Sequence, residues 1–217
     1  LAMAITFHFL INDEHPILCL SRPILKGCFI AFIAFLLLQS YLRIQVWRNG
    51  EIFWTDVISQ NPFWAPAYLN RGSYYLSQGK PRFALKDFQQ AIDLDPHNES
   101  AHKNIGHAYL FLHDFEKAKE AYTTAILFDP SDPSHYTDRG NVFFLMGNHA
   151  DSLKDYDKAL ILEPDHIASL LNRAAVLTQI QEYEKALNDY YHVLSLDVSN
   201  KLAIENIHQI TRMLGLP

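Results

Sequence analysis

The sequence predicts an all-α protein, in which a superhelical solenoid of helix-turn-helix units is preceded by a transmembrane helix. Two observations lead to this fold class. Small, aromatic and proline residues recur at one fixed interval through the last three quarters of the chain. An apolar run with a single charge precedes them at residues 24–42. A long apolar run of this kind is typical of a membrane span, and a fixed sequence period is typical of a repeat architecture.

Six columns of residues share the same period. In such solenoids each unit packs only on its neighbours. The small residues allow helices to approach closely, the aromatic residues fill the space between them, and proline ends the second helix of each unit. The columns are Pro62, Pro96, Pro130 and Pro164; Gly72, Gly106, Gly140 and Ala174; Tyr75, Tyr109, Phe143 and Leu177; Ala84, Ala118, Ser152 and Ala186; Phe88, Tyr122, Tyr156 and Tyr190; and Ala91, Ala125, Ala159 and Val193.

These columns resemble the tetratricopeptide repeat (TPR), a helix-turn-helix unit of about 34 residues, which is the interval between their members. The resemblance predicts four repeats, at 65–98, 99–132, 133–166 and 167–200. The last repeat departs from the pattern, because Ala174 stands in the glycine column and Val198 replaces the closing proline. Residues 201–217 are predicted to form a capping helix that covers the last apolar face of the solenoid.

The N-terminal part of the chain is predicted to be integral to a membrane. A helix of about 20 apolar residues spans a bilayer, and residues 24–42 fit this length. Tyr41 and Trp47 suit the membrane interface. Residues 1–11 are interpreted as the tail of a possible preceding transmembrane helix, with 12–23 as a loop. Because the chain starts at Leu1, we expect further sequence upstream.

Residues 43–62 are predicted to form a junction and a half-repeat helix. Gly50, Trp54, Val57 and Pro62 each lie one repeat period before a member of the repeat columns. This helix therefore has the pattern of a second repeat helix without a soluble first helix. The solenoid is expected to begin within a few residues of the bilayer.

Charge and motifs exclude several function classes. The net charge is −6, whereas nucleic-acid-binding domains usually present a basic face. The sequence has no phosphate-binding loop, nucleophile elbow or zinc motif. His97, His102, His107 and His113 are not spaced to place two ligands on one helix face. We therefore expect no nucleic-acid partner, no cofactor, no metal and no enzymatic activity in this chain.

One polar column indicates a binding function. The first helices of TPR solenoids line a concave groove, and an asparagine amide there can both donate to and accept from a peptide backbone. The column resembles the asparagine ladder of the TPR superhelix of O-GlcNAc transferase, although one aspartate interrupts it. The alternative is that the column belongs to a common TPR helix sequence. The candidate groove residues are Asn70, Asn104, Asp138 and Asn172, together with Lys103, His107 and Asn141.

The groove lacks most of the cations with which co-chaperone TPRs hold acidic peptide tails, so a carboxylate clamp is rejected. Apolar residues instead favour an apolar or mixed polypeptide ligand. These residues are Leu69, Leu76, Leu110, Phe111, Phe144 and Leu145.

The order of the segments also resembles a larger family. Arg43, Trp47-Arg48-Asn49, Phe53-Trp54 and Pro62 lie between the apolar run and the repeats. This order is similar to the membrane–TPR junction of transmembrane-and-TPR O-mannosyltransferase-like proteins and their bacterial relatives. That resemblance implies a periplasmic or lumenal TPR domain.

The principal expectation is a membrane-anchored scaffold that binds polypeptides in its groove. One alternative is the C-terminal substrate- or partner-binding region of a multi-span membrane glycosyltransferase. A further alternative is an assembly factor for a membrane complex.

Overall fold

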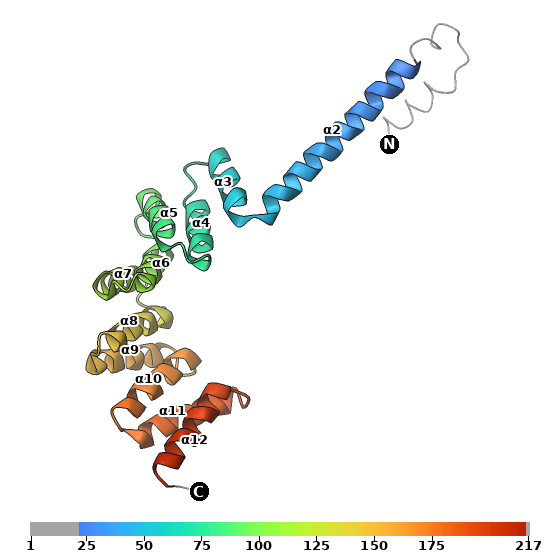
Figure 1. Ribbon diagram of the computed structural model, residues 1–217. Helices are drawn as coiled ribbons and strands as arrows, with labels where there is room; N and C mark the ends of the chain where they lie inside the picture. Colours follow the sequence, from blue (N-terminus) through green and yellow to red (C-terminus); the bar gives the residue numbers. More distant parts are fainter. Residues whose placement is uncertain (1–21, 216–217) are drawn as a thin grey trace. The chain divides into compact units, whose positions relative to one another are not determined.

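The computed structural model describes the backbone of residues 22–215 and the side chains of residues 26–41 and 49–215. The predicted helix tail at 1–11 and most of the predicted loop at 12–23 lie outside the described residues. The described chain is helical throughout, with eleven helices and short connections (Figure 1). It divides into two units, residues 1–56 and 57–217, and each is described by itself.

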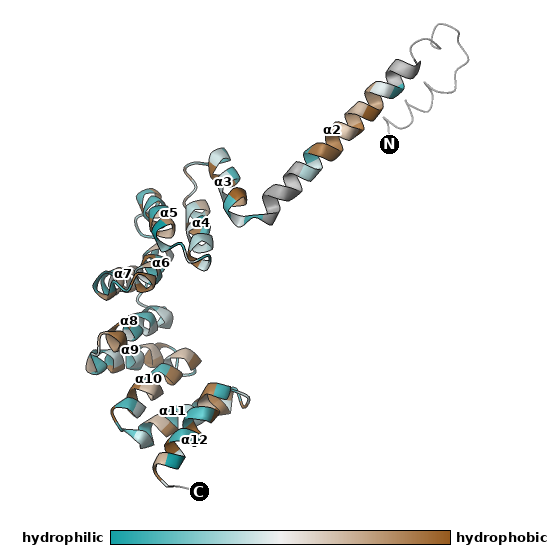
Figure 2. Cartoon of the chain, viewed as in Figure 1, coloured by the Kyte–Doolittle hydropathy of each residue, from teal (hydrophilic) through white to brown (hydrophobic). Residues whose placement is uncertain are grey.

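The first unit contains α2 (Arg22–Arg48), which is longer at both ends than the predicted helix at 24–42. Its described middle carries exposed apolar side chains, among them Phe29, Ile30 and Leu37 (Figure 2). Across the part of the chain that the structure describes, no helix is both long and apolar enough to cross a membrane. The predicted transmembrane helix is therefore not supported.

Helix α3 (Gly50–Gln60) forms where the half-repeat helix was predicted. The side-chain oxygen of Asn49 accepts hydrogen bonds from the backbone nitrogens of Glu51 and Ile52, which starts the helix. None of the residues of α3 is buried. The packing of this helix as half of a repeat stays a prediction.

The second unit is a stack of helix pairs, and each pair lies within one predicted repeat (Figure 1). Every first helix has 13 residues and every second helix has 14. The pairs are α4 (Ala65–Ser77) with α5 (Pro81–Leu94), α6 (Glu99–Phe111) with α7 (Phe115–Phe128), α8 (Pro133–Leu145) with α9 (His149–Leu162), and α10 (Ile167–Gln179) with α11 (Tyr183–Leu196).

Four of the six repeat columns form the core as their chemistry predicts, whereas the proline column is exposed. Ala84, Phe88 and Ala91 are fully buried, as are their counterparts in the next repeat. The glycine column is the point of closest approach, because a Cβ atom at Gly106 would lie 2.6 Å from the ring of Tyr122. Side chains in this core are packed as densely as a crystal, so such an overlap forces a displacement.

Helix α12 (Lys201–Met213) follows the last repeat and lies within residues 201–217, where the capping helix was predicted. Its apolar side chains Ala203, Ile207 and Ile210 are buried against Tyr190 and Val193 of α11. This contact removes from water the apolar face that a fifth repeat would otherwise cover.

The first helices lie on the inner side of the stack. Helix α4 contacts α6 and α8 contacts α10, although a second helix separates each pair in sequence. In the described chain, successive second helices contact each other less than these two pairs of first helices do. At these two boundaries the first helices approach each other more closely than the second helices do, so we take the side of the first helices as the inner side of the stack. The side chains that line the inner side are therefore those of α4, α6, α8 and α10.

Candidate functional site

All seven predicted groove residues lie on first helices. Asn70 is on α4, Asn172 is on α10, and the remaining five are on α6 and α8. Because the stacked helices follow the sequence period, members of one column occupy the same place on successive helices. The structure brings some of these side chains into contact across the repeat boundaries and leaves others without a partner.

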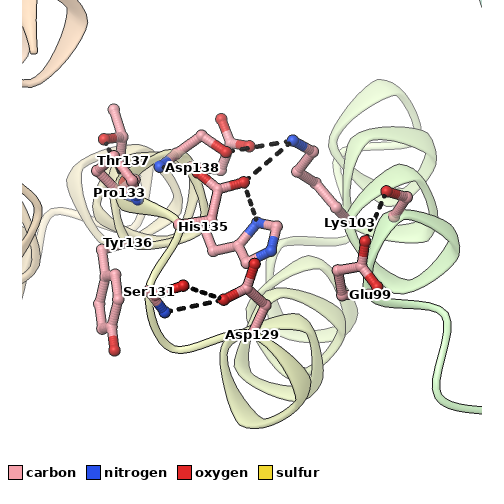
Figure 3. Close-up of polar contacts among 12 residues, drawn as sticks. Glu99, Lys103, Asp129, Ser131, Pro133, His135, Tyr136, Thr137 and Asp138 are labelled. Carbon is pink, nitrogen blue, oxygen red and sulfur yellow. Dashed lines mark hydrogen bonds and ion pairs between the residues drawn. The ribbon is translucent and has the colours of Figure 1, made fainter.

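The boundary between α6 and α8 is closed by polar contacts. Nε2 of His107 lies 3.2 Å from Oδ2 of Asp138. Since an ionised carboxylate can only accept, this geometry places the imidazole hydrogen on Nε2. The Lys103 ammonium donates to the hydroxyl of Ser134 at 3.2 Å and lies 3.9 Å from Asp132 (Figure 3). The predicted groove residues Lys103 and His107 are therefore both engaged with groups of the next repeat.

The boundary between α8 and α10 is also closed. Oδ1 of Asn141 accepts from Nδ2 of Asn172 at 2.8 Å and from the Tyr156 hydroxyl at 2.7 Å. Burial raises the pKa of Tyr156 to about 12, so the phenol remains a neutral donor at physiological pH. The amide of Asn172 thus has a structural partner within the solenoid.

The boundary between α4 and α6 differs, because the asparagine side chains of the column form no hydrogen bond there within the described residues. Neither Asn70 nor Asn104 has a side-chain hydrogen-bond partner among the residues that the structure describes. Asn70 is exposed and Asn104 is half-buried. Asn104 also lines an open pocket of about 470 Å³ between the two helices, whose other walls are Ser73, Leu76, Ser77, Gly79 and Phe111.

One buried histidine was not singled out from the sequence. His135 at the start of α8 is 1% exposed, and neither ring nitrogen has a hydrogen-bond partner within the described chain. Its Nδ1 lies 3.7 Å from Asp132 (Figure 3). Burial lowers the pKa of His135, and the Asp132 carboxylate opposes that shift. The signal was present in the repeat period, because the column reads Ala67, Ala101, His135 and Ser169.

A set of buried ion pairs was also missed. Arg139 of α8 donates to both carboxylate oxygens of Asp155 on α9, at 2.8 and 2.7 Å. The same paired contact links Arg71 to Asp87 and Arg173 to Asp189. In the second repeat Ile105 and Ala121 occupy the two positions. Both partners therefore change together, which is the signal in the sequence that could have revealed the pair.

Within the described residues, no group of three or more His, Cys, Asp or Glu side chains could hold a metal ion. The arrangement on the inner side is one of uncharged amides, hydroxyls and apolar side chains, with its few charges paired. Its chemistry is that of hydrogen bonding and apolar contact.

Comparison with known proteins identifies the repeat. Residues 65–98 and 100–132 match the sequence model of the tetratricopeptide repeat, and residues 137–194 match a second model with the same description. These matches confirm the predicted repeat type. A search of the curated proteins finds no match. The comparisons give no support to the resemblance to O-mannosyltransferase-like proteins.

Solved structures share the fold. The chain is similar to a crystal structure of MamA, with 19% identity, a TM-score of 0.58 and coverage of 73% of this chain and 87% of that one. It is also similar to the first TPR of Spaghetti (RPAP3) bound to the HSP90 peptide SRMEEVD. That match has 26% identity, a TM-score of 0.52 and coverage of 54% of this chain and 95% of that one. Through the repeats matched within residues 65–194, which together make up more than half of its length, the chain belongs to the tetratricopeptide repeat family.

Proposed function

We propose that this protein is a scaffold that binds an extended polypeptide segment along the inner side of its first helices. TPR proteins are generally scaffolds without enzymatic activity, and this chain is of that kind. The RPAP3 repeat shows that TPR domains bind peptide ligands. The row of polar side chains on α4, α6, α8 and α10 supplies the corresponding surface here.

The observation that carries the proposal is the pair of unengaged amides of Asn70 and Asn104. Each amide has donors and an acceptor, which match the N–H and C=O groups of an extended peptide. Asp138 and Asn172 occupy the same column but are already bonded to His107 and Asn141. We therefore place the main polypeptide contacts over α4 and α6.

The proposed ligand differs in charge from the RPAP3 peptide. That peptide, SRMEEVD, contains three acidic residues. In the present groove Lys103 is held by Ser134 and Asp132, and His107 is held by Asp138. A ligand carboxylate would have to displace these partners. An uncharged segment avoids that loss.

A random dodecapeptide library displayed on phage, selected against the full chain, tests the proposal. Selected peptides are then synthesised and their affinity is measured by fluorescence anisotropy. The double variant N70A/N104A is expected to bind them about tenfold or more weakly, because each lost hydrogen bond contributes about 0.5–1.5 kcal/mol.

The matched control is N172A, which removes an amide from the same column that is bonded to Asn141. Its affinity is expected to fall much less. Failure to enrich any peptide, or equal losses in N172A and N70A/N104A, would overturn the proposal.

Membrane attachment through α2 is a separate proposal, supported by the exposed apolar side chains of that helix. Carbonate washing of membranes from cells that express the full chain tests it, since an attached chain stays in the pellet and release into the wash contradicts the proposal.

For the proposed periplasmic or lumenal location, Lys86→Cys is made on the exposed face of α5 in a chain that lacks Cys19 and Cys28. Labelling of intact cells or sealed vesicles by an impermeant maleimide shows which side that face occupies.

A further inference from the structure

The pocket beside Asn104 is an open hollow between two successive first helices. Its volume of about 470 Å³ lies within the range of roughly 300–1,000 Å³ that ligand pockets usually have. Leu76 and Phe111 provide its large apolar side chains, and the Phe111 side chain is 58% exposed. A ligand that covers this ring removes apolar surface from water, which favours binding.

The lining of the pocket contains no charged residue. Ser73 and Ser77 supply hydroxyls, Gly79 supplies backbone, and Asn104 supplies an amide. The Ser73 hydroxyl already donates to the carbonyl of Leu69, and the Ser77 hydroxyl donates to that of Tyr74. The principal free polar group at the pocket is therefore the Asn104 amide, and nothing there would offset the desolvation of a charged side chain.

The position of Asn104 fixes how an extended segment would use the pocket. Successive side chains of an extended chain point to opposite sides, and the backbone groups lie between them. An amide that bonds the backbone beside an apolar hollow therefore directs one neighbouring side chain into that hollow. The apolar wall and the free amide are complementary to a single residue of the ligand and its adjoining peptide group.

The equivalent place in the next repeats lacks this combination. Asp138 replaces asparagine in the third repeat and is held by His107, while Asn172 in the fourth repeat is held by Asn141. Leu145, the counterpart of Phe111 in the third repeat, is 54% exposed, but the residue of its helix in the asparagine column is the engaged Asp138. The free amide of Asn104 and the apolar pocket lie together between α4 and α6.

We propose that the pocket lined by Leu76, Asn104 and Phe111 is a specificity pocket. It holds one large uncharged side chain, aliphatic or aromatic, of a bound extended polypeptide from another protein, while Asn104 bonds the adjoining backbone. The inference rests on the proposed function and adds the chemistry of the ligand, namely a segment with one apolar anchor and no acidic residue beside it.

The phage-selected dodecapeptides test this inference in the full chain. The enriched peptides are expected to share one Leu, Ile, Met, Phe, Tyr or Trp without Asp or Glu next to it. Replacing this anchor by Ala lowers affinity about tenfold or more. Phe111→Ser lowers affinity for the original peptide to a similar degree, but has little additional effect on the peptide that lacks the anchor, since contacting groups are not additive.

Leu145→Ser is the matched control, because it removes an equally exposed apolar side chain from the equivalent position one repeat later. Its affinity for the anchor peptide is expected to stay within about twofold. Circular dichroism and the urea midpoint verify that both variants are folded, and Phe111→Lys provides a second test of the same wall.

The outcomes separate the two proposals. Binding that depends on Asn70 and Asn104 but is unchanged by both Phe111 variants, or is weakened equally by Leu145→Ser, overturns the specificity pocket and leaves the groove in place. Enriched peptides without a shared apolar residue also overturn it. If no peptide is enriched at all, both the groove and the pocket are wrong.

Discussion

Asn141 accepts the hydroxyl hydrogen of Tyr156 at 2.7 Å. The equivalent tyrosine of the preceding repeat, Tyr122, has a buried hydroxyl without a partner in the described chain. One repeat period before Asn141 stands His107, whose ring packs edge-on against Tyr122 with centroids 5.6 Å apart. Because His107 bonds Asp138 instead, the contact that joins α6 to α8 leaves the Tyr122 hydroxyl unsatisfied.

Replacing these two tyrosines by phenylalanine should therefore have opposite effects. Tyr122→Phe removes an unsatisfied buried hydroxyl, so the free energy of unfolding should stay equal or rise by up to about 1 kcal/mol. Tyr156→Phe removes a formed bond and should lower it by about 1–2 kcal/mol. Phe88 fills the same position in the first repeat. Urea unfolding of the two variants measures the difference, and equal losses at both positions would contradict this account.

The sequence period was sufficient to predict the repeats because every column has the same packing role in every unit. Gly106 beneath Tyr122 and the buried Ala84 are examples in which one residue type serves one contact. The state of the groove was not predictable in this way. The contacts His107–Asp138 and Asn141–Asn172 join residues 31 positions apart, so they depend on the angle between successive repeats. The residue types that recur at the repeat period carry no information about that angle.

The contribution of the Arg139–Asp155 ion pair to stability can be tested with the residues that replace such a pair in the second repeat. Asp155→Ala leaves a largely buried guanidinium without its partner, and should lower the free energy of unfolding by about 2–4 kcal/mol. The double variant R139I/D155A reproduces the Ile105–Ala121 combination of the second repeat and should recover most of that loss. The control is Lys154→Ala, whose ion pair with Asp151 is exposed, so its loss should change the free energy of unfolding far less than Asp155→Ala does. A double variant no more stable than Asp155→Ala would show that the pair itself is required.

We expect His135 to make the stability of the junction between the second and third repeats depend on pH. Burial lowers its pKa from the ordinary value of 6.5, although Asp132, Asp129 and Asp138 oppose the shift and Lys103 adds to it. A histidine whose folded pKa is lowered stabilises the fold above its unfolded pKa, and that stability is lost as pH falls from about 6.5 toward the folded pKa.

The measurement is the urea unfolding free energy of wild type and His135→Ala between pH 8 and 5. Alanine occupies this column in the first two repeats, at Ala67 and Ala101. Because the substitution also removes packing, the slopes with pH are compared and not the absolute values. Wild type should lose more stability on acidification than the variant. His208→Ala, at an exposed position of α12, should retain the wild-type slope, and parallel curves for all three proteins would contradict the prediction.

The turns inside the repeats supply the last prediction, because the same position has a positive φ in all four. Gly79 and Gly147 occupy it in two repeats, at φ 67° and 76°. His113 and Gln181 occupy it in the others, at φ 58° and 67°. The left-handed conformation costs a residue with a side chain about 1–2 kcal/mol. Replacing that residue by glycine removes this cost, but glycine loses more conformational entropy on folding, which offsets part of the gain in stability.

Gln181→Gly should therefore raise the free energy of unfolding by about 0.5–1 kcal/mol. His113→Gly should gain less, because the His113 ring packs edge-on against Phe115 with centroids 6.1 Å apart. Gly147→Ala is the reverse change and should lower stability by about 1 kcal/mol, since nothing lies within 4 Å of the added Cβ and backbone strain acts alone. Thermal and urea unfolding measure all three variants. A Gln181→Gly protein less stable than wild type would mean that side-chain contacts of Gln181 outweigh the strain of its backbone.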